Sequence, residues 1–558
     1  MTPPPDRCRR GRADLLVAAT VACLVAGLAL LQLFLGPDLG LADNGDGRRV
    51  LCGADLQPPP LETAFTDVVF EIGPLTDPAA GNCGNPVLRY STSQIVLVDA
   101  VRFVDGLVSG PGLDLRAVGA TVAVLLGLGV GALYLALGGR RPARLVTVAA
   151  ATAMLLDVSY LHYASSPFSE SIGFLGLVWT AAALAWLARR PLGAASLVTL
   201  LLVAAVLVTA KSQLTALAVL VLGAVVLRVW QHLRSGERRR WPAVALAGLV
   251  VVGLTGLCGL QLAYQGPEFT RANTHNLTLF TVAPLADDPA AALTEMGLDP
   301  GLAEYAGTNA FSPDMAGDPD YAARLAEAGR ADVARYLLHH PDIAWAMLRT
   351  GVEQSALPRT PYLPEVAVAD RDASGTTEAD RWAPGTTALE RAAPVAWPLL
   401  PIGWVVLTGW GLLLALRRSV RGHDMRSWGY ALTFTAAAAA AQVVVALIGD
   451  GFYELAKHEV FVSHLTWIAL ALGLGSLVQV ARRPADDSTA DGAPTADEPR
   501  SSEGPGSTDA PRTTDTDEIA VPEYPAPPGD GADHDQDGGS RTSAPAVPVP
   551  HSRRESRT

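Results

Sequence analysis

Carboxylates, amides and cations gather at four places in the chain, each beside a long apolar run. A carboxylate can accept a proton from a hydroxyl group, and a lysine or arginine can bind phosphate. If the four clusters converge, they line one cavity with both kinds of group. They are Asp43-Asn44-Gly45-Asp46-Gly47-Arg48-Arg49, then Asp157, His162, Ser165, Ser166, Ser169 and Glu170, then Lys211, and last Asp450, Glu454, Lys457 and His458.

The lysines are the strongest anomaly among these residues. Of 42 basic residues only two are lysine, Lys211 and Lys457, and both stand at the end of an apolar run where basic residues are otherwise scarce. Each could simply extend its ammonium group to the lipid headgroups. Two lysines on the depleted side favour a binding role, because an ammonium group is a compact point charge that suits phosphate.

The acidic clusters have simpler interpretations as well. Asn44-Gly45 and Asp46-Gly47 are turn dipeptides, and a short hairpin around residue 165 needs polar turn residues. Asp157 and Glu170 are harder to explain in this way, because a carboxylate at membrane depth is costly.

The elements that must position these residues are transmembrane helices. A run of about 20 apolar residues spans a bilayer as a helix. Ten such runs are predicted, over 15–36, 116–137, 145–163, 171–188, 193–210, 214–229, 242–264, 395–416, 428–448 and 459–480. Arginines precede the first run and follow every even-numbered one, which places both termini in the cytoplasm of a bacterial inner-membrane protein.

Two long loops on the outer side and an acidic tail complete the predicted organisation. The cytoplasmic N-terminus is 1–14, and the transmembrane module 15–264 includes an outer loop, 37–115, with a helix over 95–105 capped by Ser91, Thr92 or Ser93. An extracytoplasmic domain over 265–394 and a second transmembrane module over 395–481 follow. Residues 482–558 are predicted to be a disordered cytoplasmic tail, since residues 484–558 hold net charge −10 of the total −13.

Composition also limits the function classes. The chain has no basic stripe typical of nucleic-acid binding. Its five cysteines include no C-x-x-C pair, no residue pattern implies a cofactor, and a divalent metal has no support from the sequence. Cys52 and Cys83 share the first outer loop, so a disulfide between them is a candidate in that oxidising location.

The motifs resemble those of the GT-C superfamily of membrane glycosyltransferases, more narrowly a group of bacterial glycan-biosynthesis hexose transferases. The matching segments are Asp43-Asn44-Gly45-Asp46 with Arg49, Ser166-Pro167-Phe168-Ser169-Glu170, Glu454-Leu455-Ala456-Lys457-His458, and, in the outer domain, His340-Pro341 and Pro361-Tyr362-Leu363. Asp43 stands where the family has asparagine, and Pro167 departs from the second motif.

The resemblance implies transfer of a hexose from a polyprenyl-phosphate donor to a hydroxyl of an envelope glycan, in the lipid bilayer at its outer face. It assigns the base to Asp46, with Asp43 second and Glu170 in support. The cations that face the departing phosphate would come from Arg49, Lys211, Lys457 and His458, with Glu454 beside them.

Other functions fit parts of the sequence. A flippase or exporter of glycan precursors predicts internal symmetry, and no repeat is visible. A polymerase or ligase of lipid-linked glycans would use His339, His340 and Arg349 of the outer domain. A non-catalytic envelope scaffold is the remaining alternative.

Overall fold

The fold is described from a computed structural model of the chain. It describes residues 5–78, 83–84, 91–107, 110–234, 241–312, 320–326, 329–360, 362–417 and 422–481, all of which belong to one compact unit. The predicted acidic tail, 482–558, and Pro361 of the sequence motif lie outside these ranges.

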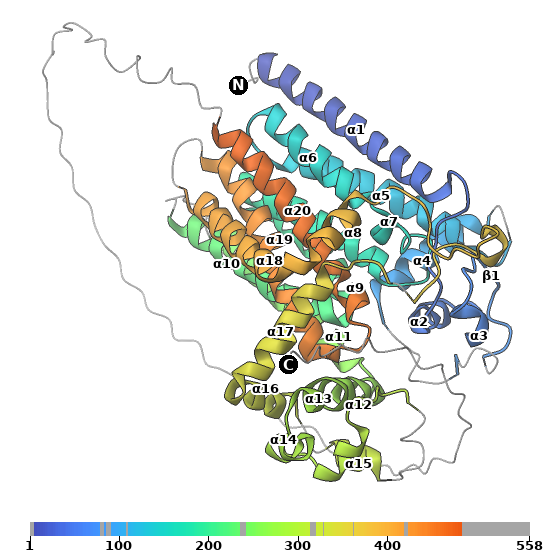
Figure 1. The fold of residues 1–558 in the computed structure, drawn as a ribbon. Helices are drawn as coiled ribbons and strands as arrows, with labels where there is room; N and C mark the ends of the chain where they lie inside the picture. The colour runs from blue at the N-terminus through green and yellow to red at the C-terminus, as the bar shows by residue number, and fades with distance from the viewer. Residues whose placement is uncertain are drawn as a thin grey trace, which may run out of the picture. The chain divides into compact units, whose positions relative to one another are not determined.

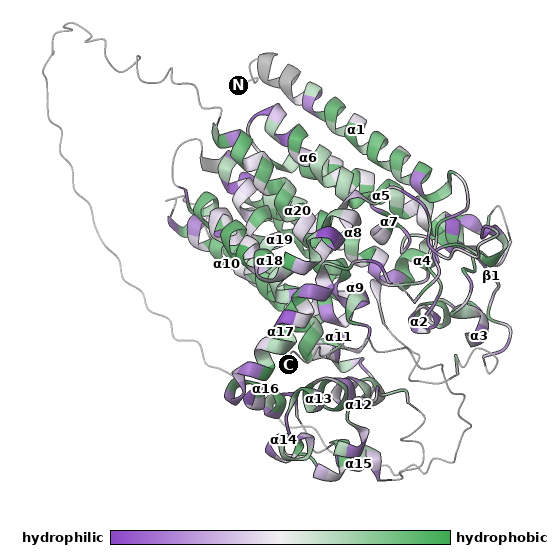
Figure 2. Ribbon diagram, viewed as in Figure 1, coloured by the Kyte–Doolittle hydropathy of each residue, from purple (hydrophilic) through white to green (hydrophobic). Residues whose placement is uncertain are grey.

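The chain is an all-α polytopic membrane protein. Within the described ranges, eight helical segments are long and apolar enough to cross a membrane (Figure 1), and the hydropathy colouring of Figure 2 shows that hydrophobic residues predominate along the long helices. The segments belong to α1 Pro5–Phe34, α5 Leu115–Ala136, α8 Glu170–Arg189, α10 Ala218–Arg234 with the 3₁₀ segment Ser212–Leu217 before it, α11 Trp241–Ala263, α18 Pro384–Leu416, α19 Gly422–Asp450 and α20 Leu455–Ala481.

Eight of the ten predicted spans correspond to these segments, and two differ. The span predicted over 193–210 is a helix of 17 residues, α9 Ala194–Ala210. The span predicted over 145–163 is not one continuous helix, because α6 Arg141–Leu155 ends early and is followed by α7 Val158–Leu161. The break serves Asp157, whose side chain caps α7 and also accepts hydrogen bonds from the amide and hydroxyl of Thr386 at the start of α18.

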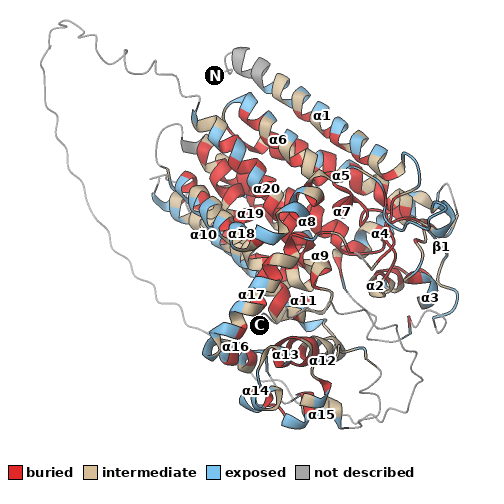
Figure 3. Cartoon of the chain, in the orientation of Figure 1, coloured by how far each residue is buried: buried red, intermediate tan, exposed pale blue. Residues whose placement is uncertain are grey.

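Packing places α8 at the centre of the bundle. It contacts α5, α9 and α19, and almost its whole length is buried (Figure 3). In turn, α19 packs against α18 and α20, and α1 packs against α5. By contrast α1, α11 and α18 leave many leucines and valines exposed, as expected for surfaces that face lipid.

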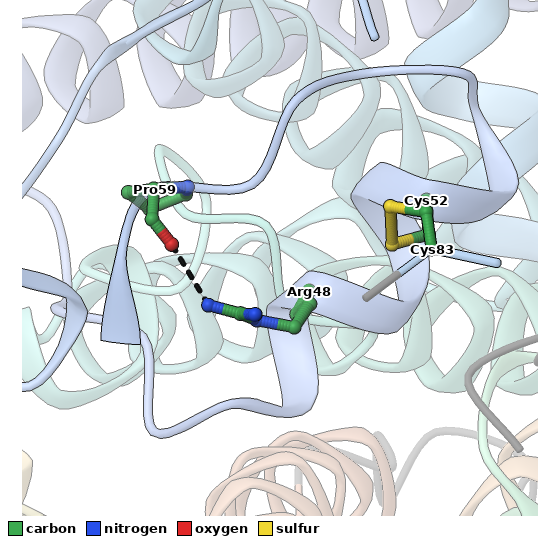
Figure 4. The surroundings of a disulfide bond; sticks show 4 residues. All are labelled: Arg48, Cys52, Pro59 and Cys83. Carbon is green, nitrogen blue, oxygen red and sulfur yellow. Dashed lines mark hydrogen bonds between the residues drawn. A yellow bond between two sulfur atoms is a disulfide. The ribbon is translucent and has the colours of Figure 1, made fainter. Parts of the chain in front are cut away.

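In the described residues of the first long loop, 35–114, there are three short helices and one strand pair. They are α2 Asp46–Gly53, α3 Leu61–Ala64, α4 Ser93–Asp105, and β1 Glu71–Ile72 paired antiparallel with β2 Leu113–Asp114. The helix predicted over 95–105 is α4, and its cap is Thr92, whose side chain accepts from the Gln94 amide. Cys52 at the end of α2 is joined to Cys83 by a disulfide with an S–S distance of 2.00 Å (Figure 4).

The second long loop, 264–383, is largely helical. It contains α12 Pro267–His275, the π-helix Asn276–Val282, α13 Ala283–Leu285, α14 Pro289–Glu295, the 3₁₀ segment Pro300–Tyr305, α15 Tyr321–Ala326, α16 Arg330–His339, α17 Pro341–Ser355 and the 3₁₀ segment Val368–Asp370. The strap that follows α17, residues 357–383, crosses back to the first loop. There the amides of Gly40 and Ala42 donate to the carbonyls of Glu365 and Pro364, directly before Asp43.

Candidate functional site

The Asp43–Gly47 turn presents Asp46 at the start of α2. One carboxylate oxygen of Asp43 accepts from the amides of Gly45 and Gly47, both at 2.8 Å. Gly45 has φ +99°, a conformation that favours glycine, and a Cβ on Gly47 would lie only 2.3 Å from Cγ of Pro167. The carboxylate of Asp43 is therefore occupied in building the turn, whereas Asp46 begins the helix, where a negative charge is favoured.

A buried lysine lies directly behind Asp46. The Nζ atom of Lys457 donates to Oδ2 of Asp46 at 2.5 Å and to Oδ1 of Asn44 at 2.9 Å. The amide of Asn44 donates to both oxygens of Glu454, at 2.6 and 2.7 Å. The first and last sequence motifs thus form one network, and the side chain of Lys457 is fully buried within it.

Glu454 adopts an unusual backbone conformation to join this network. Its φ is +47°, in the left-handed region that non-glycine residues seldom occupy. Such conformations cost free energy and persist only where surrounding contacts hold them. The two hydrogen bonds from Asn44 are contacts of that kind.

Two further cations stand beside Asp46. Arg49 lies one turn along α2, with Nη1 3.4 Å from Oδ1 of Asp46 and its guanidinium 3.8 Å from the centre of the Phe269 ring. Lys211, at the end of α9, pairs with Oε1 of Glu170 at 2.5 Å. Glu170 is 1% exposed, so this carboxylate lies beneath Lys211 and holds it in place.

A second hydrogen-bonded row follows the same cluster. Oδ2 of Asp450 is 3.2 Å from Nε2 of His458, whose Nδ1 is 3.1 Å from Oε1 of Gln213. The other oxygen of Asp450 accepts from the amide of Asn276 at 2.7 Å. The row therefore joins α20 to the 3₁₀ segment Ser212–Leu217 and, through Asp450 at the end of α19, to the π-helix of the second long loop.

These groups surround one cavity of about 390 Å³ at the ends of α9, α11 and α19. Its polar lining includes Asp46, Arg49, Lys211, Asn276, Asp450, Glu454 and His458. Leu262 of α11 and Val444, Ala446 and Ile448 of α19 supply an apolar wall on two membrane helices. A molecule with a charged head and a hydrocarbon tail fits this combination of walls.

Opposite pKa shifts separate the two aspartates. Burial raises the pKa of Asp43 above its ordinary value, and its backbone hydrogen bond from Gly47 offsets this only partly. Burial alone would raise the pKa of Asp46 too, but Lys457 and Arg49 outweigh it and hold that pKa well below its usual range. Asp46 is therefore an ionised carboxylate on the cavity wall.

The structure brings most of the predicted site residues together. Asp46, Arg49, Lys211, Glu454 and His458 line the cavity. Asp43, Glu170 and Lys457 lie buried directly behind it, each paired with a neighbour.

The remaining polar residues near 160 have structural contacts instead. Asp157 links α7 to α18, as described above, and His162 bonds to Glu365 of the strap through Nδ1 at 3.0 Å. Both side chains are fully buried. They fasten the 157–170 segment beneath the two long loops.

The residues that a polymerase or ligase would use lie on the surface of α16 and α17. His340 and His339 are 2.9 and 3.9 Å from the carboxylate of Glu295, and Arg349 pairs with Glu353 one turn away. These are largely exposed polar contacts between neighbouring helices or turns, and contacts of this kind add little stability.

Several cavity residues could not be recognised in the sequence. Phe269, Phe311 and Tyr453 are aromatic residues in loops or short helices, with no periodic pattern to single them out. Asn276 has one local signal, the sequence Asn276-Leu277-Thr278, which is easily read as a chance glycosylation sequon. In the part of the chain that the structure describes, no three His, Cys, Asp or Glu side chains are grouped to hold a metal ion.

Comparison with known proteins gives one family match and weak structural likenesses. The family described as the YfdI N-terminal transmembrane domain matches residues 8–488. No curated protein matches the chain.

Two solved structures are similar at low identity. The archaeal oligosaccharyltransferase AglB from Archaeoglobus fulgidus, in complex with an inhibitory peptide and a dolichol-phosphate, is 12% identical over 82% of this chain, with TM-score 0.36. This chain spans 50% of that protein's length. ArnT from Cupriavidus metallidurans, bound to undecaprenyl phosphate, is 14% identical over 84% of this chain and 77% of its own, with TM-score 0.26.

Proposed function

The chain belongs to the family of the YfdI N-terminal transmembrane domain, and we propose that it is a GT-C-type membrane glycosyltransferase. In this proposal a hexose moves from a polyprenyl-phosphate donor to a hydroxyl of an envelope glycan, at the outer face of the bacterial inner membrane. One observation carries the proposal. A single cavity joins an ionised carboxylate, the cations Arg49, Lys211 and Arg330, and an apolar wall built from membrane helices.

The cavity accommodates each part of such a donor. The polyprenyl chain lies along Leu262 and Ile448, at the ends of α11 and α19, where burial of apolar surface is favourable. Its phosphate lies between Arg49 and Lys211, because both cations reach the cavity and charge-assisted hydrogen bonds to phosphate are strong. The proposal gives Lys457 another role, since that side chain is buried and holds Asp46 in position.

The reaction is a substitution at the anomeric carbon. The acceptor oxygen forms a bond to that carbon while the bond from carbon to the phosphate oxygen breaks. The bonding electrons leave with the phosphate, which departs as polyprenyl phosphate held by Arg49 and Lys211. Asp46 accepts the acceptor's proton, and its negative charge also stabilises the positive charge that develops on the sugar.

Asp46 is chosen over the other two candidate carboxylates by its position. Its side chain is 30% exposed and lines the cavity, whereas Asp43 and Glu170 are only 5% and 1% exposed and lie behind the cavity wall. A base must come within about 3 Å of the hydroxyl whose proton it takes.

A transfer assay in proteoliposomes tests the proposal. The full-length protein is supplied with polyprenyl-phosphate hexoses and glycan acceptors, and both the glycosylated product and the released polyprenyl phosphate are measured. The two products should form in equal amounts. Ala272→Trp fills the cavity from α12 and should abolish transfer, whereas Ala291→Trp, on an exposed surface of α14, should leave it unchanged.

Two results would contradict the proposal. One is transfer by Ala272→Trp at the wild-type rate. The other is movement of a fluorescent polyprenyl-phosphate hexose across the bilayer without any glycosylated product, which would favour a flippase.

A further inference from the structure

One wall of the cavity carries no group that the proposed transfer uses. Phe311 and Tyr453 lie there with ring centres 5.4 Å apart and planes inclined by 44°. Phe311 is 50% exposed although it is a large apolar side chain. Asn276 and Asp450 line the same cavity.

The amide of Asn276 is fixed at both of its polar atoms. Nδ2 donates to Oδ1 of Asp450 at 2.7 Å, and Oδ1 accepts from the backbone amide of Ala310 at 2.9 Å. Asn276 is 1% exposed. The side chain of Asp450 is 18% exposed and keeps lone pairs that can accept from a ligand, while Asn276 lies buried behind it and holds its carboxylate in place.

The loop that carries Phe311 is held from below. The Nδ1 atom of His275 accepts a hydrogen bond from the Tyr321 hydroxyl, and its Nε2 lies 2.7 Å from the carbonyl of Thr308. Burial lowers the pKa of His275 to about 4, so the ring is neutral and donates to that carbonyl. The Phe311 amide donates to the side chain of Asn309, which completes the turn.

The turn that carries Asp450 and Tyr453 is locked to the π-helix. Gly451 has φ +61°, and a Cβ there would lie 2.1 Å from Oγ1 of Thr281. The same hydroxyl accepts from the Phe452 amide at 2.8 Å and donates to the carbonyl of Asn276 at 2.8 Å. Single π-helical turns often occur at functional sites, and this one fixes the polar and aromatic parts of the wall relative to each other.

We propose that Phe311, Tyr453, Asn276 and Asp450 form a saccharide subsite that receives a hexopyranose ring. The C–H bonds of a sugar carry partial positive charge and pack on the negative faces of aromatic rings. The carboxylate of Asp450, held by Asn276, accepts hydrogen bonds from hydroxyls of the ring. The inference rests on the proposed function and names the part of the cavity that recognises sugar.

Two sugars could occupy the subsite, and both have the same chemistry. One is the hexosyl group of the donor, whose phosphate lies near Lys211. The other is the terminal residue of the acceptor glycan. Binding and kinetic measurements on the same variants separate these two sources.

The experiment uses full-length protein in lipid nanodiscs and three variants. Phe311→Leu removes the ring but keeps an apolar side chain, and Phe311→Trp restores a ring. Phe103→Leu is the control, because Phe103 is 73% exposed on α4, a helix outside the cavity lining. The dissociation constants of polyprenyl-phosphate hexose and of bare polyprenyl phosphate are measured, together with the acceptor KM.

If the subsite holds the donor sugar, Phe311→Leu raises the Kd of the hexose lipid by roughly fivefold and leaves bare polyprenyl phosphate unchanged. If it holds the acceptor, donor binding is unchanged and the acceptor KM rises by roughly the same factor. In either case Phe311→Trp recovers most of the loss, and Phe103→Leu behaves as wild type.

Three results would contradict the proposed saccharide subsite without contradicting the proposed transferase activity. They are an unchanged Kd and KM in Phe311→Leu, an equal loss for bare polyprenyl phosphate, or the same loss in Phe103→Leu. A wild-type protein that binds no polyprenyl phosphate contradicts the proposed function itself, and the subsite falls with it.

Discussion

Asp46 is a base of a particular kind in the proposed reaction. Its pKa lies well below the usual range, because Lys457 and Arg49 outweigh the effect of burial. Asp46 is therefore ionised, but it is a weak base. Proton transfer must then come late, when the bond from the anomeric carbon to the phosphate has largely broken. Until that point the negative charge of Asp46 stabilises the cationic sugar.

The pH dependence of transfer should reveal how far Lys457 lowers the pKa of Asp46. The ionised form of Asp46 is the active one, and its pKa is lowered from 3.8, so wild-type kcat/KM should not fall on account of Asp46 down to about pH 4. Lys457→Met removes the largest lowering influence but leaves burial, so the pKa of Asp46 rises. We expect the acid limb of kcat/KM to move to higher pH, and an acid limb identical to that of the wild type would rule out this role for Lys457.

Substitutions of Lys211 and Glu170 should have different effects on donor binding and transfer. Lys211→Gln removes a cation that lines the cavity, so it should raise the donor Kd by about tenfold or more, the value of one charge-assisted hydrogen bond. Glu170→Gln keeps a hydrogen-bonding group beneath Lys211, so it should remain partly active. Donor affinity unchanged by Lys211→Gln would instead support a lysine that only reaches the lipid headgroups.

At the scale of elements, α2 depends on tertiary contacts. It has eight residues, too few for a stable helix on its own. The Asp43 turn fixes its start, Arg48 donates to the carbonyl of Pro59 at 2.9 Å, and the disulfide from Cys52 fixes its end (Figure 4). The positions of Asp46 and Arg49 therefore depend on the loop around them.

The disulfide should be measurable by thiol labelling and by stability. In a background with Cys8, Cys23 and Cys258 replaced by serine, the protein should react with a thiol reagent only after reduction. Cys52→Ser should destabilise the first loop by about 3–4 kcal/mol in the chain-entropy model, since the bond closes a sequence separation of 31 residues. Labelling of both cysteines without reduction would show that the bond is absent in the native protein.

Hydropathy predicted the long helices well because each needs only a continuous apolar run. It missed the break within 145–163, where the apolar run continues but α6 ends and the side chain of Asp157 accepts hydrogen bonds from Thr386 at the start of α18. That contact joins residues 229 positions apart, and no local pattern encodes it.

The same reason limits prediction of the candidate site. Asp46, Arg49 and Lys211 could be singled out, because charged residues beside apolar runs are rare enough to be noticed. Asn276 and Phe311 could not, since each matters only through its place on the cavity wall. The burial of Lys457 behind Asp46 likewise depends on how the first and last motifs meet.

At the scale of the whole molecule, the proposal requires both long loops on the outer side of the membrane. Reporter fusions should therefore give a cytoplasmic signal at Gly139, between α5 and α6, and an outer signal at Gly375 in the strap. The arginines that follow α5 are the physical reason, since basic residues are retained on the cytoplasmic side. A cytoplasmic signal at Gly375 would contradict the topology.

The most direct test of the central claim measures donor binding and transfer in one preparation of Asp46→Asn. Asparagine keeps the size of the side chain but cannot accept the acceptor's proton as a carboxylate does. The control is Asp55→Asn, the same change at an exposed position just beyond α2.

We predict that Asp46→Asn binds the polyprenyl-phosphate hexose but loses nearly all transfer, while Asp55→Asn keeps both. Near-normal turnover in Asp46→Asn, together with its loss in Asp43→Asn or Glu170→Gln, would contradict the assignment of the base even if the protein is a glycosyltransferase.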